Sequence, residues 1–207
     1  MKTVTSQKLL LVLIMLCSHP VLSQQHILFY KLMKANVSVG ELIVYENHTE
    51  DIRTIKTTTK ALVPNLLFDI KMEDIKYSEF KNQVLQTATV TRKLFNGSPQ
   101  VSKTIKSEGV YSDGQSPLTS LRGINEISYT STMLYTTEPN DQTHIYSEYH
   151  HQFMKVQRIA PHAYCIRFPD GQTCYYYYEK GICVRIVTQT SWATIESILI
   201  SQNLAYK

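Results

Sequence analysis

The sequence predicts a mostly β fold, a single curved antiparallel sheet or incomplete barrel with one short helix. Short runs rich in β-branched and aromatic residues recur along the chain, and turn-forming residues separate them. Residues 163–187 contain three such runs, at 163–168, 172–178 and 182–187, joined by two links that each end in glycine. Glycine supplies the positive φ that such hairpin links need. These observations predict a β-meander.

The other predicted strands follow in order before and after this meander. Their links, such as 34–36, 81–83 and 96–97, contain asparagine, which tolerates tight or left-handed backbone. Threonines at 57–59 and at 87, 89 and 91 fit strands with one hydrated face, which favours an antiparallel sheet. The predicted strands are 27–33, 39–46, 52–62, 67–77, 84–95, 101–107, 143–149, 151–159 and 194–201.

Two segments interrupt the strand pattern. Residues 112–122 contain Asp113-Gly114 and Ser116-Pro117, which are typical of a loop. Residues 124–135 fit both periods: Ile127 and Leu134 match a helical stripe, whereas Tyr129 and Tyr135 match strand alternation. We expect the single short helix in this second segment.

Residues 1–23 have the features of a secretory signal peptide. Lys2 and Lys8 precede an apolar run at 9–17, and Pro20 and Ser23 follow at cleavage spacing. The run is shorter than the roughly 20 residues that cross a bilayer, so we expect no membrane-spanning segment and one exported domain at 24–207, in the periplasm or cell envelope. Lipidation of Cys17 is an alternative, disfavoured because Leu16 is not small.

Charge argues against some partners. Without Lys2 and Lys8, the 21 basic residues become 19 against 17 acidic residues, and the formal net charge falls from +4 to +2. The lysines are scattered among threonines and acids, whereas nucleic-acid binding leaves a clustered basic surface. We therefore expect no nucleic-acid partner.

Three cysteines follow the leader, in a compartment where disulfides form. Three-residue links would place Cys165 opposite Tyr175 and Cys183 opposite Tyr177, with Cys174 on the other face, so we expect three small apolar core residues. A one-residue slip in the first link would instead pair Cys165 with Cys174.

The same register divides the meander into two faces. The apolar face is either ordinary core or the lining of a trough that holds a hydrophobic ligand, with tyrosine hydroxyls as its polar points. The other face is either hydrated or docks a protein, since Tyr and Arg are enriched at interfaces, and it places Tyr175 across from Arg185. The candidate ligand-binding residues are Tyr164, Ile166, Phe168, Tyr176, Tyr178, Val184 and Ile186, and the candidate partner-binding residues are Arg167, Tyr175 and Arg185.

Other candidate sites are weaker. In a strand, His150 and His151 point to opposite faces and His144 is about 20 Å from His150 at ~3.3 Å per residue, so we expect no metal site. Glu138 and Glu148 could form the carboxylate pair of a glycan-acting hydrolase if they converged. No nucleophile elbow, metalloprotease, phosphate-loop or dinucleotide motif is present. We therefore assign no catalytic residue and no cofactor.

Several motifs resemble an uncharacterised family of exported proteins from Gram-negative bacteria of the Bacteroidota type, known only as a domain of unknown function. They are YKLMKANVSVGEL at 30–42, LYTTEP at 134–139, IYSE at 145–148 and RFPDGQTCYYYYEKGICVRI at 167–186. The chain departs from that family at Thr136-Thr137 and His150-His151. The resemblance implies a β-rich fold and brings no enzyme activity, cofactor or catalytic residue. At the level of fold alone, such proteins are similar to curved sheets that carry lipoproteins or hydrophobic ligands across the periplasm.

The leading hypothesis is a non-catalytic exported binding protein whose curved sheet holds a hydrophobic ligand, such as a lipid, or an acylated partner. Two alternatives stay open. One is a structural or interaction module that docks another envelope protein, and the other is the hydrolase that uses Glu138 and Glu148.

Overall fold

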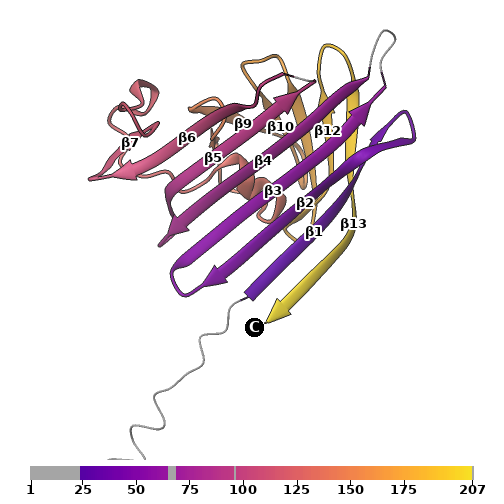
Figure 1. Ribbon diagram of the computed structural model, residues 1–207. Helices are drawn as coiled ribbons and strands as arrows, with labels where there is room; N and C mark the ends of the chain where they lie inside the picture. The colour runs from indigo at the N-terminus through magenta and orange to yellow at the C-terminus, as the bar shows by residue number, and fades with distance from the viewer. Residues whose placement is uncertain (1–23, 65–68, 96, 207) are drawn as a thin grey trace, which may run out of the picture.

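The computed structural model describes residues 24–64, 69–95 and 97–206, which form one antiparallel sheet of 13 strands (Figure 1). The strand order is β7-β6-β5-β4-β3-β2-β1-β13-β12-β11-β10-β9-β8, and the sheet is not closed. The predicted mostly β, curved antiparallel fold is confirmed. The signal peptide expected at residues 1–23, with Cys17, lies outside the described residues.

Most strands lie close to their expected positions, and the three-residue strand β7 was not predicted. The strands are β1 Gln24–Lys34, β2 Val37–Thr49, β3 Ile52–Val63, β4 Ile70–Lys81, β5 Val84–Leu94, β6 Gln100–Ser107, β7 Val110–Ser112, β8 His144–Ser147, β9 Gln152–Ala160, β10 Ala163–Arg167, β11 Thr173–Glu179, β12 Ile182–Gln189 and β13 Thr194–Tyr206. Among the described residues, no helix is long and apolar enough to span a membrane.

Local turn chemistry explains the hairpins. Ala35 and Asn36, between β1 and β2, both have positive φ (47° and 65°), and so do Asn82 and Gln83 between β4 and β5 (50° and 64°). Two-residue links with two positive φ angles match the twist of the flanking strands. Tight hairpins therefore place β1 beside β2 and β4 beside β5, and all strands of the first half are ordered along the sheet as they are in the chain.

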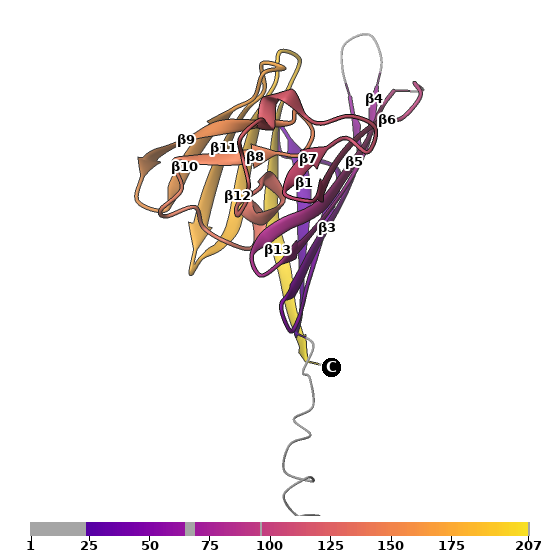
Figure 2. The ribbon, with the colours of Figure 1, turned by 90° about the vertical axis from the view of Figure 1, so that its left-hand side faces the viewer.

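The sheet folds into two wings. We call β1–β7 the first wing and β8–β12 the second wing, and β13 joins them by pairing with both β1 and β12. Figure 2 shows the wings diverging from this seam, with the segment that links β7 to β8 between them. That segment carries two 3₁₀ helices, η1 (Thr119–Leu121) and η2 (Ser131–Tyr135), and η2 contacts β3, β4, β8 and β12.

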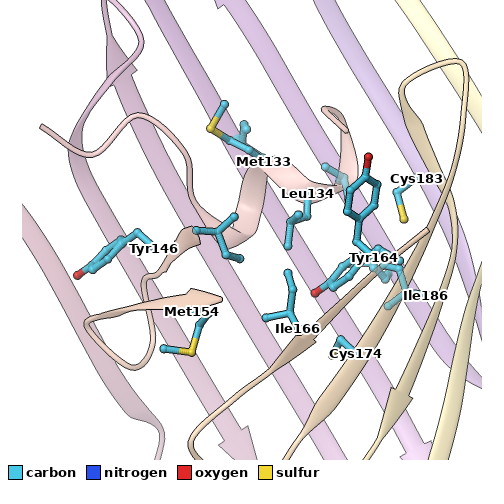
Figure 3. Packing of buried hydrophobic residues seen from close by; sticks show 14 of the residues in the cluster. Met133, Leu134, Tyr146, Met154, Tyr164, Ile166, Cys174, Cys183 and Ile186 are labelled. Atoms are coloured by element: carbon cyan, nitrogen blue, oxygen red, sulfur yellow. The ribbon is translucent and has the colours of Figure 1, made fainter. Parts of the chain in front are cut away.

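The core lies between the facing surfaces of the wings. Alternate residues of β1, such as Leu28 and Tyr30, are buried from the first wing, and Tyr164 and Ile166 are buried from the second. Leu134 of η2 belongs to the same buried cluster, and Figure 3 shows it with Tyr164 and Ile166 of the second wing. The short helix thus fills the space that an open sheet of this curvature would leave beneath it.

The helix expected at 124–135 is present only as the five-residue 3₁₀ turn η2. The preceding residues are extended because their carbonyl groups bond to strands instead of to each other. Ile127 accepts from the Leu85 N–H (2.8 Å), Tyr129 accepts from the Tyr146 N–H (3.0 Å), and Thr130 forms a bridge with Tyr146. Tertiary pairing therefore overrides the helical spacing of the sequence.

The register of the meander was predicted correctly in its first hairpin and wrongly in its second. Cys165 pairs with Tyr175, as expected from a three-residue link. In the second hairpin Glu179 pairs with Ile182 across a two-residue link, and a bulge follows at Tyr177/Tyr178. Two consequences follow: Cys183 points into the core, and Val184 does not belong to it.

Candidate ligand-binding pocket

A pocket of about 330 Å³ lies between the two wings and is lined by residues of both. The loops β10–β11 and β12–β13, at the upper edge of Figure 2, contribute Asp170 and Trp192. The first wing contributes Leu32, Leu42, Thr59, Met72, Asp74, Lys76, Arg92 and Leu94 to the lining. The segment between the wings and the β8–β9 turn contribute Ser131, Tyr135, Tyr149 and His150. The second wing and β13, with their loops, contribute Ser147, Phe168, Asp170, Gln172, Cys174, Tyr176, Ile186, Thr188, Thr190, Ser191, Trp192, Ile195 and Ser197.

One part of the pocket wall is apolar. Leu32 and Leu42, on the neighbouring strands β1 and β2, belong to the hydrophobic core cluster, and so do Tyr176 and Ile186 of the second wing. Trp192, the single tryptophan of the chain, is half-buried and packs against the same cluster. Apolar walls with a few convergent polar groups are typical of small-molecule sites.

The polar part of the wall is organised around Arg92 of β5. Its Nε donates to Asp74 Oδ2 at 3.0 Å on the neighbouring strand, and a terminal nitrogen lies 3.8 Å from Asp170 Oδ2 of the second wing. The guanidinium also lies over the Tyr149 ring, 4.0 Å from its centroid. Arg92 is therefore held by three residues and bridges the two wings.

Lys76, two residues after Asp74 on β4, differs from Arg92 in its contacts. No described residue accepts a hydrogen bond from its ammonium group or forms an ion pair with it within 4.0 Å. Burial lowers the pKa of Lys76, but electrostatic interactions with Tyr135, Asp74 and Glu148 raise this pKa by more, so the side chain is protonated at neutral pH. Asp74 Oδ1 is also buried without a partner among the described residues.

His150 lies in the pocket wall as a neutral ring. Its Nδ1 is 2.9 Å from Ser147 Oγ, and the ring stacks on Phe168 with centroids 5.6 Å apart. Nε2 lies 3.5 Å from Asp170 Oδ2 without hydrogen-bond geometry. Burial lowers the pKa of His150 more than the Asp170 charge raises it. The imidazole therefore adds no positive charge to the pocket at neutral pH.

The structure separates the seven residues of the predicted ligand face. Phe168, Tyr176 and Ile186 line the pocket. Tyr164 and Tyr178 are buried in the core, where their hydroxyls donate to Glu138 and to the Leu134 carbonyl (2.9 and 2.8 Å). The other two are Ile166, which is fully buried in the core, and Val184, which is half-buried outside the core cluster.

Sequence reasoning missed the charged residues of the pocket. In β4 the alternation from Ile70 to Phe80 places Asp74, Lys76 and Ser78 on the inward face, although Ile75 and Tyr77 are the more apolar set. Phe80 lies next to the β4–β5 turn and faces inward. Counting back from Phe80 in steps of two along β4 could have identified these three inward residues.

The candidate partner-binding residues lie on the outer face of the meander. Arg167 is exposed and Tyr175 is half-buried. The expected pairing of Arg185 with Tyr175 is wrong, because the bulge places Arg185 opposite Tyr177, where its guanidinium lies 5.4 Å from the ring centroid. Arg185 also forms an ion pair with Glu196 at 3.0 Å.

Glu138 and Glu148 are both buried, and neither lines the pocket. Glu138 accepts from Tyr164 and lies 3.0 Å from His162 Nδ1, whereas Glu148 accepts from residues of β4 and η2. The two carboxylates thus have separate sets of partners.

Metal and disulfide chemistry can be stated for the described part of the chain. No three His, Cys, Asp or Glu residues gather there as a metal site. Cys165, Cys174 and Cys183 are buried free thiols, and the slipped register that would pair Cys165 with Cys174 does not occur.

The fold and the pocket define a class, an open curved antiparallel sheet with a mixed apolar and charged pocket between its wings. The chain belongs to the family described as Domain of unknown function (DUF6134), which matches residues 30–200. The match runs from β1 to β13 and therefore includes every strand of the sheet. A comparison with curated proteins finds no match.

Proposed function

We propose that this chain is a non-catalytic binding protein that holds a hydrophobic ligand, or the acyl chain of a partner, in the pocket between its wings. The observation that carries the proposal is the pocket itself, about 330 Å³, with an apolar wall from both wings. Small-molecule sites have volumes of roughly 300–1,000 Å³ and this kind of lining.

The charged residues support binding better than catalysis. Arg92 is occupied by Asp74, Asp170 and Tyr149, so it positions the two wings rather than a reacting group. Burial raises the pKa of the Cys174 thiol, which lines the pocket, and a protonated thiol is a poor nucleophile. The polar contacts of His150, which also lines the pocket, are with Ser147 and Asp170, and no described cysteine is among them.

We further propose that the protein is exported by a Gram-negative cell of the Bacteroidota type and acts in the periplasm or cell envelope. The basic, apolar and small-residue regions of residues 1–23 support cleavage near Ser23. An intact-mass measurement on protein from the envelope fraction tests this. A chain that begins at Gln24 supports export, and a full-length chain in the cytoplasm contradicts it.

Native mass spectrometry of the envelope-purified protein tests the binding function. We expect a fraction of the protein to carry a non-covalent lipid-sized mass. The pocket-filling substitution Thr59→Phe should abolish that mass, because Thr59 lines the pocket. Thr58→Phe is the matched control, since the neighbouring residue of β3 faces the other side of the sheet.

A second readout uses Trp192 of the pocket wall, whose fluorescence should change when an amphiphile enters. The proposal fails if wild-type protein carries no added mass and no amphiphile of any head group alters Trp192 emission. It also fails if Thr59→Phe and Thr58→Phe retain the bound mass equally.

A further inference from the structure

Lys76 is a half-buried cation that lines the pocket, and no described residue accepts a hydrogen bond from it. Its cross-strand neighbours, Thr57 on β3 and Val90 on β5, are both buried. Next on the same face, Ser78 has 0% exposure and bonds to Glu148, which closes that end of the pocket. An ammonium carries three N–H donors, and a ligand that covers them must supply acceptors, because burying these donors without acceptors is unfavourable.

The acidic oxygens near Lys76 are engaged elsewhere or out of reach. Glu148 accepts from Ser78, Ser131 and Thr132, and Asp74 Oδ2 accepts from Arg92. Asp74 Oδ1 has no donor among the described residues and does not form an ion pair with Lys76 within 4.0 Å. The inner end of the pocket therefore presents one donor group and one acceptor, and neither has a partner among the described residues.

The charge balance of the pocket indicates which ligand group would bind to Lys76 and Asp74 Oδ1. The cations Lys76 and Arg92 are balanced by Asp74 and Asp170, and Glu148 adds a further negative charge behind Lys76. A free carboxylate would add a second uncompensated negative charge beside Asp74, which low dielectric makes costly. An uncharged carbonyl oxygen accepts from Lys76 without adding any charge.

The order of residues along β4 gives the direction of the ligand. From the inner end outward, the inward face shows Lys76, then Asp74, then Met72, and Met72 pairs with Leu94, which is 39% exposed. Trp192 and Ser191 are in the loop that lines the same pocket. Along β4 the charged groups thus lie deeper than Met72, so we expect the head of an amphiphile to enter first.

Resting on the binding function proposed above, we propose that the ligand is an acyl ester or acyl amide with an uncharged head. Its carbonyl oxygen accepts a hydrogen bond from Lys76 Nζ, and an adjacent hydroxyl or amide hydrogen is donated to Asp74 Oδ1. The acyl chain extends along Met72 and Leu94 toward Trp192.

The test is a head-group series on the wild-type protein, read by Trp192 emission below each amphiphile's micelle concentration. The probes share one chain: 1-monolauroylglycerol (ester), N-lauroylglycinamide (amide), laurate (anion) and dodecyltrimethylammonium (cation). We expect the ester or the amide to bind at least about tenfold more tightly than either charged probe. Which of the two binds more tightly distinguishes a glycerolipid from an N-acylated source.

Lys76→Met keeps the apolar stem and removes the ammonium. We expect it to weaken binding of the favoured neutral probe about tenfold and to leave laurate binding unimproved. Lys56→Met is the control, because Lys56 is exposed on the opposite face of the neighbouring strand. The inference is overturned if laurate or the cation binds most tightly, if all heads bind alike, or if Lys76→Met has no effect. In each of these cases the pocket still binds amphiphiles, so the proposed function survives. Absence of any Trp192 response, together with absence of a co-purified mass, refutes that function instead.

Discussion

Thr132 meets the carboxylate of Glu148 twice, because its backbone N–H donates to Oε1 at 3.0 Å and its hydroxyl lies 2.9 Å from the same oxygen. Ser131 binds the other oxygen with its N–H and hydroxyl (3.2 and 2.5 Å), and Ser78 of β4 donates at 3.3 Å. The first turn of η2 thus has its free N–H groups capped by an acid from the β8–β9 turn. This one carboxylate joins β4, η2 and the second wing.

Glu148→Gln should lower the free energy of unfolding by about 3 kcal/mol. The amide nitrogen would face N–H and O–H donors where an oxygen now accepts, so at least one buried donor would lose its partner. Urea unfolding at neutral pH measures the loss. Glu179→Gln, at an exposed position, should change stability by less than about 0.5 kcal/mol. Equal effects of the two substitutions would contradict the capping role.

Gly40→Ala should destabilise the first wing by about 2–3 kcal/mol. A Cβ at Gly40 would lie 2.1 Å from the Lys60 carbonyl oxygen and 2.7 Å from Ala61 Cα, and both are backbone atoms that cannot move without shifting β3. Thermal and urea unfolding measure the change. Gly97→Ala is the comparison, because its Cβ would meet only the Leu94 oxygen at 3.3 Å. A Gly40→Ala protein as stable as Gly97→Ala would refute the close approach.

The fold could be predicted from the sequence where local chemistry decides it. The links at Asn36 and Asn82 specify tight turns, and tight turns between alternating runs specify an antiparallel order of neighbours. The second hairpin of the meander was misread because EKG permits both a two-residue and a three-residue link. The extra residue is absorbed by a bulge that only packing selects.

The pocket could be predicted only in part, because its two walls come from segments far apart in the chain. Phe168, Tyr176 and Ile186 share a face by alternation alone and were identified. Lys76 and Arg92 look like ordinary charges of hydrated strands, and nothing local shows that the second wing folds over them. Alternation from Phe80 assigns Lys76 to the inward face, but whether that face is covered is a tertiary property that the sequence of β4 does not show.

The three cysteines should resist alkylation in the folded protein. Burial raises the pKa of Cys183 to about 12 and also raises the pKa values of Cys165 and Cys174. Since the thiolate is the reactive form, iodoacetamide at mildly alkaline pH should leave all three unlabelled, and the same treatment in urea should label all three. Peptide mass spectrometry measures the alkylation of each cysteine. A peptide pair joined through Cys165 and Cys174 would contradict the free-thiol state.

Acid should destabilise the protein through Glu46. Burial raises the pKa of this carboxyl, but a hydrogen bond from His48 and the charge of Arg53, whose Nε lies 2.5 Å away, lower the pKa by more, to below its usual 4.5. A lowered folded pKa means that the ionised pair stabilises the fold above pH 4.5 and that this contribution is lost as pH falls further. Glu46→Gln should therefore cost about 3 kcal/mol at neutral pH, with the difference from wild type shrinking below pH 4.5.

Urea unfolding across this pH range, with Glu41→Gln of the same strand as an exposed control, separates Glu46 from the other acids. Wild type should lose more stability on acidification than Glu46→Gln, and Glu41→Gln should follow wild type. Because Arg53 also donates to Thr136 and Thr137 (3.0 and 2.8 Å), acid unfolding should begin where the segment between the wings meets β3. Parallel loss in wild type and Glu46→Gln would show that the buried Glu46–Arg53 pair contributes nothing to acid sensitivity.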